Sequence, residues 1–406
     1  MDTDMYQIFK LDNPIQNYAW GSRVAIAELL GDAVPSDRPQ AEMWMGAHPK
    51  APSMLKVKEH VVSLPDLIKE NPDAILGVEA ARKFNRRMPF LFKVLAAAEP
   101  LSIQAHPDRE QARAGFDREN RQGVPLDAPR RNYRDASHKP EIICALTDFW
   151  GLNGFRPIAT IDRNLRHYGP QTLMSMAGKL DAQDETRSLK IFFEELLRMS
   201  DSRRVDVIDD VIEQARRKAS PDSVAEWVMR LHTAYPGDIG ILAPLFLNLV
   251  CLAPGQAMYL SAGQLHAYLE GVGIELMANS DNVLRGGLTP KHVDVGELMQ
   301  VLQFTAGEPQ IITARPVGPV ENIYDTPAEE FELARLSMNG DHEFTAASDR
   351  RIEILLMAEG AATIETTDGQ VKYTLRKGDS VLIPACLPGY CIRGKGQFFR
   401  ASVPSL

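Results

Sequence analysis

Two stretches of the chain, "PGQAMYLSAGQLHAY" at 254–268 and "RKGDSVLIPACLPGY" at 376–390, decide how this sequence folds. Each has a glycine followed by five residues and then a second turn, at Ser-Ala or Pro-Ala, before another strand begins. Short strands separated by glycine and proline turns are typical of small β-sandwiches and barrels. Because the same design occurs twice, we predict two related β units in one chain.

The spacing of these stretches resembles the second half-motif of the cupin barrel family, G-x5-P-x-G-x2-H. In the first copy Gly255, Gly263 and His266 match the pattern, with Ser261 in the proline position. In the second copy Gly389 stands where the histidine is expected. The resemblance implies two barrels, of which only the first has a histidine that can bind a metal.

A helical segment divides the strand-rich parts of the chain. Between about 156 and 235 apolar residues recur at i, i+3, i+4 and i+7, as in "SLKIFFEELLRMS", which predicts amphipathic helices. We expect a mainly β fold with a helical insertion, made of two cupin-type (jelly-roll) barrels and an all-α domain. The expected domains are a discontinuous catalytic cupin barrel at 1–154 and 245–310, a helical insertion at 155–244, and a degenerate cupin barrel without metal at 311–406.

The overall composition limits the possible functions. The 406 residues include 44% apolar and 24% charged side chains, with a net charge of −9, which is ordinary for a soluble globular protein. No block of like charge indicates a nucleic-acid surface. The apolar stretch "IGILAPLFLNLVCLAPG" from Ile239 is interrupted by Pro244 and Asn248 and is too short to span a bilayer. Four cysteines without a C-x-x-C pair favour a reducing compartment. We therefore expect a cytoplasmic monomer that binds neither nucleic acid nor membrane.

The segment "LSIQAHPD" at 101–108 places polar residues in an otherwise apolar region. Residues i and i+2 of a strand point to one face, so Gln104 and His106 are predicted to lie side by side. His266 adds a second imidazole, and Glu141 in "SHKPEIICAL" adds an anion. This set suits a divalent ion such as zinc with one open position. Taken singly, each residue has an ordinary alternative role, as a hydrogen-bonded core group or a strand-edge charge.

Several cations lie near these candidate ligands. Lys93 lies inside the apolar run "FLFKVL", where an ammonium group needs a partner or a ligand. Lys139 lies in "SHKPE", and Arg285 and Lys291 follow His266 in a Gly- and Pro-rich loop. Together these cations can receive a dianion such as a phosphate ester. The alternative is that Arg285 and Lys291 are solvated loop charges.

Longer motifs are more specific than these spacings. The segments "HAYLEGVGIELMANSDNVLRGGLTPK" (266–291), "YRDASHKPE" (133–141) and "PFLFKVLAAAEPLSIQAHPD" (89–108) occur in this order, with further matches over most of the chain. The sequence thereby resembles type I phosphomannose isomerases, which interconvert mannose 6-phosphate and fructose 6-phosphate. Two residues depart from that family's pattern: Ser137 stands where Asn is usual, and Gly286 stands where Ala is usual.

The resemblance implies a role for each candidate residue. It assigns zinc ligands to Gln104, His106, Glu141 and His266, and it makes Arg285 the catalytic arginine, which stabilises an enediolate or the phosphate. The remaining expected roles are proton transfer between C2 and C1 by Lys139, Glu275 or Asp281, and substrate binding by Lys93, Ser102, Lys139, Arg285 and Lys291, with Trp20 in the pocket wall or in the core.

Two other functions stay open on the sequence alone. An iron-dependent cupin oxygenase would also use histidine and carboxylate ligands, but it gives no reason for the cations. A non-catalytic cupin sugar-phosphate-binding protein would keep the pocket without the reaction. The resemblance favours an aldose–ketose isomerase with one Zn²⁺ per chain, acting on a small phosphosugar through a cis-enediol(ate).

Overall fold

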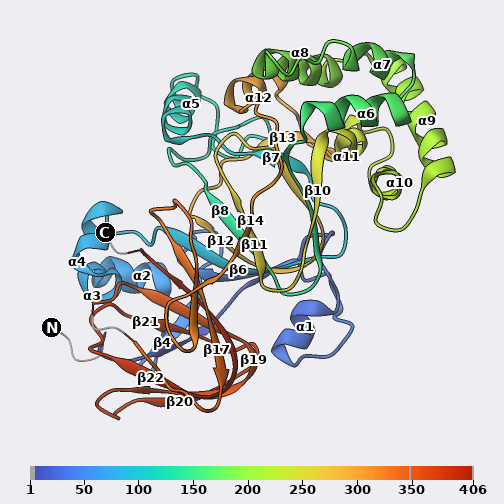
Figure 1. Cartoon of the computed structure of the whole chain (residues 1–406). Coiled ribbons are helices and arrows are strands. Elements are labelled where there is room, and N and C mark those ends of the chain that lie inside the picture. Colours follow the sequence, from blue (N-terminus) through green and yellow to red (C-terminus); the bar gives the residue numbers. More distant parts are fainter. Residues whose placement is uncertain (1–4, 347–348, 405–406) are drawn as a thin grey trace.

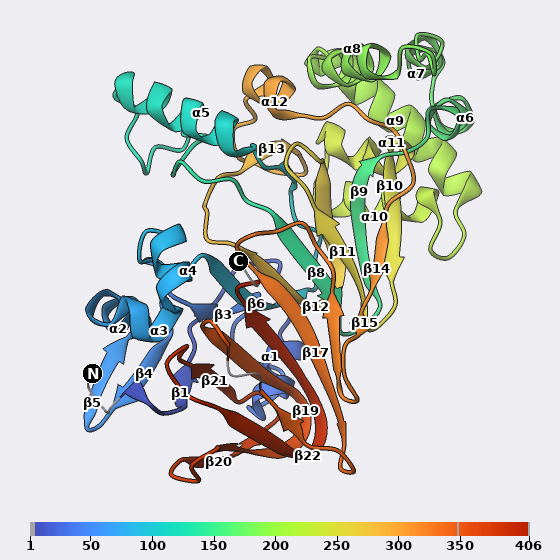
Figure 2. The same cartoon turned by 60° about the vertical axis from the view of Figure 1, so that its left-hand side comes forward.

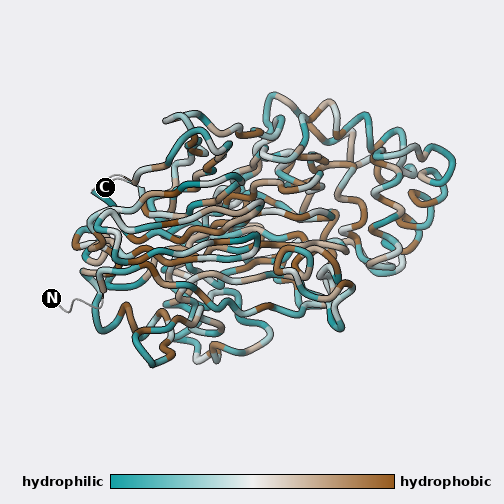
Figure 3. The backbone as a smooth tube through the Cα atoms, turned by 90° about the horizontal axis from the view of Figure 1, so that it is seen from below, coloured by the Kyte–Doolittle hydropathy of each residue, from teal (hydrophilic) through white to brown (hydrophobic). Residues whose placement is uncertain are grey.

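The protein is described by a computed structural model that covers residues 5–346 and 349–404. It contains two large sheets, each of eleven strands, and a group of helices at one end of the molecule (Figure 1, Figure 2). Hydrophilic and hydrophobic residues alternate along many of the strands (Figure 3), as expected where one face of a sheet is buried. The prediction of a mainly β fold with a helical insertion is confirmed.

The first sheet, here called the site sheet, is organised around the long strand β12 (His266–Ala278). The C-terminal half of β12 pairs with β6 and β8, and its N-terminal end pairs with β7 and β9. Gly271, between these two halves of β12, has φ +126°, and a Cβ there would lie 2.6 Å from the carbonyl oxygen of Asp148. This position therefore requires glycine. The other strands of the site sheet are β2 (Ile15–Gln16), β3 (Glu42–Gly46), β6 (Phe90–Ala97), β7 (Ile103–Ala105), β8 (Glu141–Ala145), β9 (Phe149–Phe155), β10 (Leu247–Leu252), β11 (Gln256–Leu260), β13 (Leu284–Gly287) and β14 (Ile311–Thr313).

The second sheet, here called the C-terminal sheet, runs in the order β15-β16-β17-β22-β19-β21-β1-β4-β5, with β18 and β20 alongside. Its centre is the pair of long strands β19 and β22, which are joined over most of their length. Its strands are β1 (Phe9–Asp12), β4 (Met54–Val57), β5 (His60–Ser63), β15 (Arg315–Pro316), β16 (Glu321–Tyr324), β17 (Glu332–Asn339), β18 (Phe344–Thr345), β19 (Glu353–Thr366), β20 (Lys372–Arg376), β21 (Ser380–Ile383) and β22 (Tyr390–Ser402).

The N-terminal strands pair differently from our expectation. We assigned residues 1–154 to the first barrel, but β1, β4 and β5 extend the C-terminal sheet. Phe9 of β1 lies opposite Leu382 of β21, and both side chains share one buried cluster with Phe92 and Ile274 of the site sheet. The two sheets therefore have a common core, because each buries its apolar face against the other. The domain boundaries themselves stay a prediction.

The helical insertion follows the predicted periodicity. In α8 the buried side chains are Leu189, Phe192, Phe193 and Leu196, spaced i, i+3, i+4 and i+7. Phe155 of β9 meets Phe193 edge to face, with ring centroids 5.6 Å apart, and so joins the insertion to the site sheet. The elements of the insertion are α6 (Ile158–Tyr168), α7 (Gln171–Ala177), α8 (Glu185–Leu197), α9 (Asp201–Lys218), α10 (Val224–Ala234), the 3₁₀ helix η2 (Ile239–Leu242) and α11 (Ala243–Phe246).

Helices outside the insertion were not expected from the strand-like texture of the first 154 residues. The most important is α5, which begins with a reciprocal capping box between Asp108 and Gln111. Because this cap starts the helix directly after β7, it fixes His106 between a strand end and a helix start. The helices outside the insertion are α1 (Ala25–Leu30), α2 (Leu64–Glu70), α3 (Pro72–Leu76), α4 (Val78–Lys83), α5 (Arg109–Arg121) and α12 (Val295–Val301).

Candidate metal centre and active-site pocket

Three buried side chains from three separate segments converge at one point. His106 follows β7, Glu141 begins β8 and His266 begins β12. One possible ligand atom from each lies within 4.8 Å of the others. The Nε2 atoms of His106 and His266 lie 3.4 and 3.6 Å from the two carboxylate oxygens of Glu141. Two imidazoles and one carboxylate around a common point form a typical zinc-binding set.

The hydrogen bonds of the two histidines fix their tautomers. The Nδ1 atom of His106 lies 2.7 Å from the carbonyl oxygen of Asn282, and that of His266 lies 2.9 Å from the carbonyl oxygen of Gln264. Since a carbonyl oxygen only accepts, both Nδ1 atoms donate, and both Nε2 atoms present lone pairs to the site.

Both Nε2 atoms are buried and lack a hydrogen-bond partner in the described part of the chain. Burial and the Lys139 ammonium lower the pKa of His106. Burial and the neighbouring His106 lower the pKa of His266 to about 4. Two neutral, unpartnered nitrogens facing one carboxylate would be costly unless they bind a ligand. The residues present therefore fit a divalent metal.

Glu141 supplies the negative charge of this centre. It is 3% exposed, and the ammonium of Lys139 lies 2.9 Å from its Oε1. Burial opposes ionisation, but Lys139 and the histidines hold the pKa of Glu141 well below its usual range. The carboxylate is therefore charged at neutral pH, as a metal ligand must be.

Gln104 adjoins the centre through strand register. On β7 it lies opposite His266 of β12 on one side and opposite Arg285 of β13 on the other. It also lines the same pocket as Glu141. The structure thus brings together all four expected ligands, three by the distances between their ligand atoms and Gln104 by register.

An open cavity of about 220 Å³ extends from the metal centre. Of the residues expected from the sequence, it is lined by Gln104, Glu141, Lys93, Lys139, Glu275 and Asp281. Its other polar walls come from Glu42, His48, Lys50 and Ser280, with Tyr18, Trp44 and Tyr268 as aromatic walls. The volume and the mixture of both charges suit a small, highly hydroxylated ligand.

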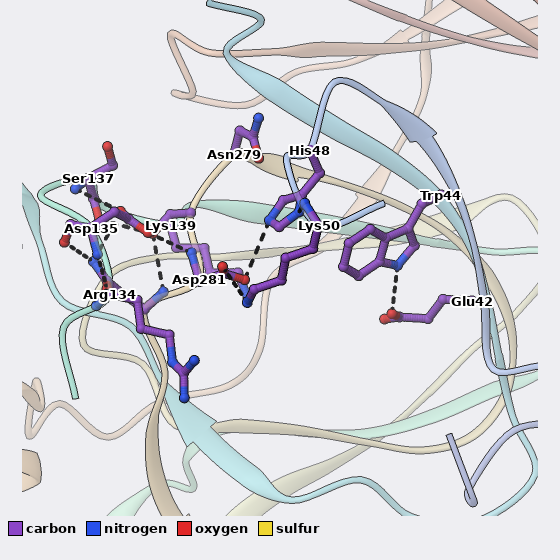
Figure 4. Close-up of polar contacts among 12 residues, drawn as sticks. Glu42, Trp44, His48, Lys50, Arg134, Asp135, Ser137, Lys139, Asn279 and Asp281 are labelled. Carbon is purple, nitrogen blue, oxygen red and sulfur yellow. Dashed lines mark hydrogen bonds and ion pairs between the residues drawn. The ribbon is translucent and has the colours of Figure 1, made fainter. Parts of the chain in front are cut away.

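Lys93 is part of a buried ion network in the pocket. Its ammonium donates to Glu275 over 2.8 Å and lies 3.3 Å from Glu42. The other oxygen of Glu42 accepts from the Trp44 indole over 2.8 Å, a contact that Figure 4 shows. Burial disfavours the ammonium, but the two carboxylates more than compensate and raise the pKa of Lys93. Burial raises the pKa of Glu275. We expected Lys93 to hold phosphate, but the structure pairs it with two acids, because β3, β6 and β12 bring these residues together.

Asp281 is held by two basic residues that the sequence analysis did not select. Its carboxylate lies 2.7 Å from the ammonium of Lys50 and 3.5 Å from Nε2 of the buried His48, and Figure 4 shows both contacts. Burial raises the pKa of Asp281, but hydrogen bonds from His48 and Lys50 more than compensate and hold it far below its usual range. Both residues lie in the segment "EMWMGAHPKAPS" at 42–53, which also resembles the family pattern and could have indicated them.

Arg285 and Lys291 lie outside the cavity wall, in a cationic cluster with Arg134. Burial and the charge of Arg134 lower the pKa of Arg285, and burial, Arg285 and Arg134 lower that of Lys291. Among the described residues no acid acts on Arg285 or Lys291, and the guanidinium of Arg134 has no marked contact in Figure 4. A set of cations that repel one another is a ready receptor for an anion.

Two further expected residues lie away from the cavity wall. Trp20 packs against the core, while Tyr18 lines the cavity and is stacked on Trp20 with ring centroids 5.7 Å apart. Of the two roles considered for Trp20, core is therefore the better description. Ser102 lies partly buried in the turn before β7 and is not part of the wall.

A buried two-histidine, one-glutamate centre at the end of a charged pocket, on a cupin-like double-sheet fold, defines a metal-dependent cupin protein. Domain models described as phosphomannose isomerase type I catalytic domain and helical insertion domain match residues 8–158 and 170–247. A third, described as mannose-6-phosphate isomerase cupin domain, matches residues 322–403. The chain belongs to the type I phosphomannose isomerase family.

Individual relatives agree over the full length. The mannose-6-phosphate isomerase of Escherichia coli K12 is 39% identical over 402 residues, which cover 96% of this chain and 98% of the relative. The Homo sapiens mannose-6-phosphate isomerase is 36% identical, covering 93% of this chain and 94% of the relative. A zinc-bound crystal structure of a mannose 6-phosphate isomerase superposes with a TM-score of 0.90 at 36% identity, covering 98% of this chain and 100% of that chain. The family resemblance noted in the sequence is thus confirmed.

Proposed function

We propose that this chain is a zinc-dependent aldose–ketose isomerase that interconverts mannose 6-phosphate and fructose 6-phosphate through a cis-enediol(ate). The observation that carries the proposal is the pair of unpartnered Nε2 atoms facing Glu141 at the end of a polar pocket. Family membership and a zinc-bound solved relative support it. Neither an iron oxygenase nor a non-catalytic sugar-phosphate-binding protein is favoured by these findings.

The metal would be held by His106, Glu141 and His266, with Gln104 as a fourth ligand through its amide oxygen. When bound there, zinc supplies a Lewis acid that polarises the sugar oxygens. Lys139, 2.9 Å from Glu141, keeps that carboxylate ionised and adds a positive charge to the same wall of the pocket. Both effects favour the enediolate, in which negative charge develops on oxygen.

Proton transfer between C2 and C1 needs a group whose pKa lies near the working pH. Of the three candidates, Asp281 is held ionised far below that range, and Lys139 is already paired with Glu141. Burial raises the pKa of Glu275, and its carboxylate faces the cavity beside Lys93. We therefore assign the proton-carrying role to Glu275, with Lys93 positioning its carboxylate.

The phosphate is expected to bind the cationic cluster of Arg134, Arg285 and Lys291. Burial lowers the pKa of Arg285 and Lys291 most, and repulsion between the cations lowers it further; binding of a dianion would relieve that repulsion. Because Arg285 lies opposite Gln104 in the strand pairing, the cluster adjoins the metal centre, so one small ligand can reach both. Arg285 then stabilises the phosphate or the enediolate.

The proposed substrate of this chain is a small phosphosugar. No described helix is both long and apolar enough to cross a bilayer. The expected monomeric state, the cytoplasmic location and the absence of a nucleic-acid partner stay predictions.

A coupled assay tests the proposal directly. Purified protein is assayed for conversion of mannose 6-phosphate to fructose 6-phosphate before chelation, after chelation, and after zinc is restored. We expect activity that is lost with the chelator and recovered with zinc but not with magnesium, since imidazole ligands disfavour magnesium. Activity that persists after complete removal of metal would overturn the proposal.

A further inference from the structure

The side-chain amide of Asn282 is fully committed to one loop. Asn282 is 0% exposed. Its Oδ1 accepts from the backbone N–H groups of Arg134 and Asp135 over 2.7 and 3.2 Å. Its Nδ2 donates to the carbonyl oxygens of Asp135 and Ser137, each over 2.8 Å. A buried amide that bonds with both its oxygen and its nitrogen to the backbone of three residues in one short segment holds that backbone in one conformation.

The main chain of Asn282 also touches the metal centre. Its carbonyl oxygen accepts from Nδ1 of the buried His106 over 2.7 Å, and this contact sets which nitrogen of His106 faces the site. One residue therefore joins a candidate metal ligand to the loop at 134–137 through two different groups.

The loop held by Asn282 connects two functional parts of the pocket. At its start is Arg134, a member of the cationic cluster. After its end come Lys139 and Glu141, which lie 2.9 Å apart in the pocket wall. Figure 4 shows Arg134, Asp135, Ser137 and Lys139 following one another along this path. Movement of the 134–137 loop would therefore displace side chains of both the metal centre and the cationic cluster.

A second set of bonds supports the same loop. The carboxylate of Asp135 accepts from the Ser280 hydroxyl over 2.9 Å and from the backbone N–H of Asp281 over 2.8 Å. The Ser280 hydroxyl also lies 3.2 Å from the carbonyl oxygen of Ser137. Residues 280–282 and 134–137 thus form a small hydrogen-bond network, to which Arg134 and Asp281 contribute backbone N–H groups and Asp135 contributes its carboxylate.

We propose that Asn282 is a positioning residue that sets the metal affinity of the centre by fixing the 134–137 loop and His106 relative to each other. The inference rests on the proposed function, since it needs the metal centre to exist. Without the amide, Glu141 and Lys139 would sample more positions, and binding of the ion would have to order them. Residues that orient metal ligands from outside typically change metal affinity about 10–100-fold when replaced.

The experiment compares three variants by competitive titration with zinc alone against a chromophoric chelator, together with thermal melting of each apoprotein. Asn282→Asp keeps the size and the acceptor, but it replaces the bonds that Nδ2 donates to the carbonyl oxygens of Asp135 and Ser137 and to the Asp135 carboxylate by repulsion between oxygens. Ser280→Ala removes the weaker support and leaves Asn282 in place. Asn279→Ala is the control, because within residues 5–346 and 349–404 this nearby side-chain amide makes a single hydrogen bond, of 3.5 Å, to the Met88 carbonyl.

We expect the zinc dissociation constant of Asn282→Asp to rise about 10–100-fold, that of Ser280→Ala to rise less, and that of Asn279→Ala to match the unmodified protein. Unchanged affinity in Asn282→Asp, measured on folded apoprotein, would overturn the inference. If Asn282→Asp does not fold, Ser280→Ala decides, and wild-type affinity there overturns it equally. If the unmodified protein itself fails to bind zinc, the proposed function fails instead, so the two failures are distinct.

Discussion

Replacing Lys93 by Met tests the buried ion network of the pocket. The Lys93 ammonium lies 2.8 Å from Glu275 and 3.3 Å from Glu42, and the three residues are between 3% and 7% exposed. Methionine has similar length without charge, so two buried carboxylates would lose their cation. Removing one partner of a buried ion pair typically costs about 3–5 kcal/mol, and we expect a loss of that size in the free energy of unfolding at pH 8.

The loss should shrink as the pH falls. Burial already raises the pKa of Glu275, and in the variant the opposing charge of Lys93 is gone, so this pKa should rise further. A carboxyl group with a raised pKa in the folded state contributes its full stability below the unfolded-state pKa. That contribution is lost as the pH rises through the folded-state value. At pH 5.5 the variant can protonate Glu275 and recover part of its stability.

Urea denaturation of both proteins, followed by tryptophan fluorescence at pH 8 and pH 5.5, gives the measurement. The matched control is Lys10→Met, since Lys10 pairs with Asp379 at 3.5 Å and the two side chains are 47% and 34% exposed. Exposed pairs contribute about 0–1 kcal/mol. A Lys93→Met loss no greater than that of the control, or one that grows at pH 5.5, would refute the reasoning.

Three further changes probe the metal centre, the phosphate-binding cluster and strand β13. Glu141→Gln should lower zinc affinity by more than about 100-fold, because it removes a ligand charge rather than a supporting contact; full zinc content by elemental analysis would exclude Glu141. Arg134→Met should raise KM for mannose 6-phosphate about tenfold, equivalent to about 1.4 kcal/mol, with kcat nearly unchanged; steady-state kinetics that show the reverse would remove Arg134 from phosphate binding. Gly286→Ala should raise stability in urea by about 0.4–1 kcal/mol, since φ is ordinary and the nearest atoms to a new Cβ are side-chain ends, beginning with Leu265 at 3.2 Å; a loss of stability would contradict this.

The metal centre could be predicted because its signal is local. His106, Glu141 and His266 each lie at the start or end of a strand within a recognisable motif. The spacing within each motif identified residues that can bind a metal. The family resemblance predicted that the three segments contribute to one site. The hydrogen bonds that orient the rings come from the carbonyl oxygens of Gln264 and Asn282. Main-chain groups are present at every residue, so nothing in the sequence marks these two.

The partners of Lys93 could not be read from the sequence. Lys93 lies opposite Glu275 on one side and opposite Trp44 on the other. A shift of one residue in either pairing would turn the partner side chains to the opposite face. The register between β3, β6 and β12 is set by packing over the whole sheet, and composition does not reveal it. A buried lysine was therefore predictable, but its carboxylate partners were not.

The departures from the family pattern can now be assigned a physical meaning. Ser137 contributes its carbonyl oxygen and its N–H group to the loop network, and its side chain is exposed. Any residue other than proline can make these backbone contacts at this position. The substitution of serine for the usual asparagine therefore leaves the support of Glu141 intact at the level of hydrogen bonding.

The pairing of the N-terminal strands had no local signal either. β1 alternates apolar and polar residues in a way that either sheet would accept, and its partner β21 lies more than 360 residues further along the chain. Strand texture predicts that a segment is a strand, but the choice of sheet depends on which apolar face it covers. Loop lengths and turn residues do not encode that choice.

The shared core explains why a unit without metal ligands matters to the site. Side chains alternate along a strand, so Glu141 faces the pocket while Ile142 faces the other side, where it joins a buried cluster with Phe331 and Ile354 of the C-terminal part. The same alternation places Glu275 in the pocket and the adjacent residues Ile274 and Leu276 in that cluster. The position of each pocket-facing side chain therefore depends on how the C-terminal sheet packs against the opposite face of the site sheet.

A buried ion pair also connects the two parts of the chain. Glu330, which is 7% exposed, lies 2.8 Å from Nε2 of His138 and 2.7 Å from Arg109 of α5. Burial raises its pKa, but His138 and Arg109 more than compensate and lower the pKa of Glu330 to about 2. The buried carboxylate of Glu330 thus holds His138, the residue directly before Lys139 in the sequence. Because both the core and this contact act on the strand that begins at Glu141, the C-terminal part stabilises the metal centre without contributing a ligand to it.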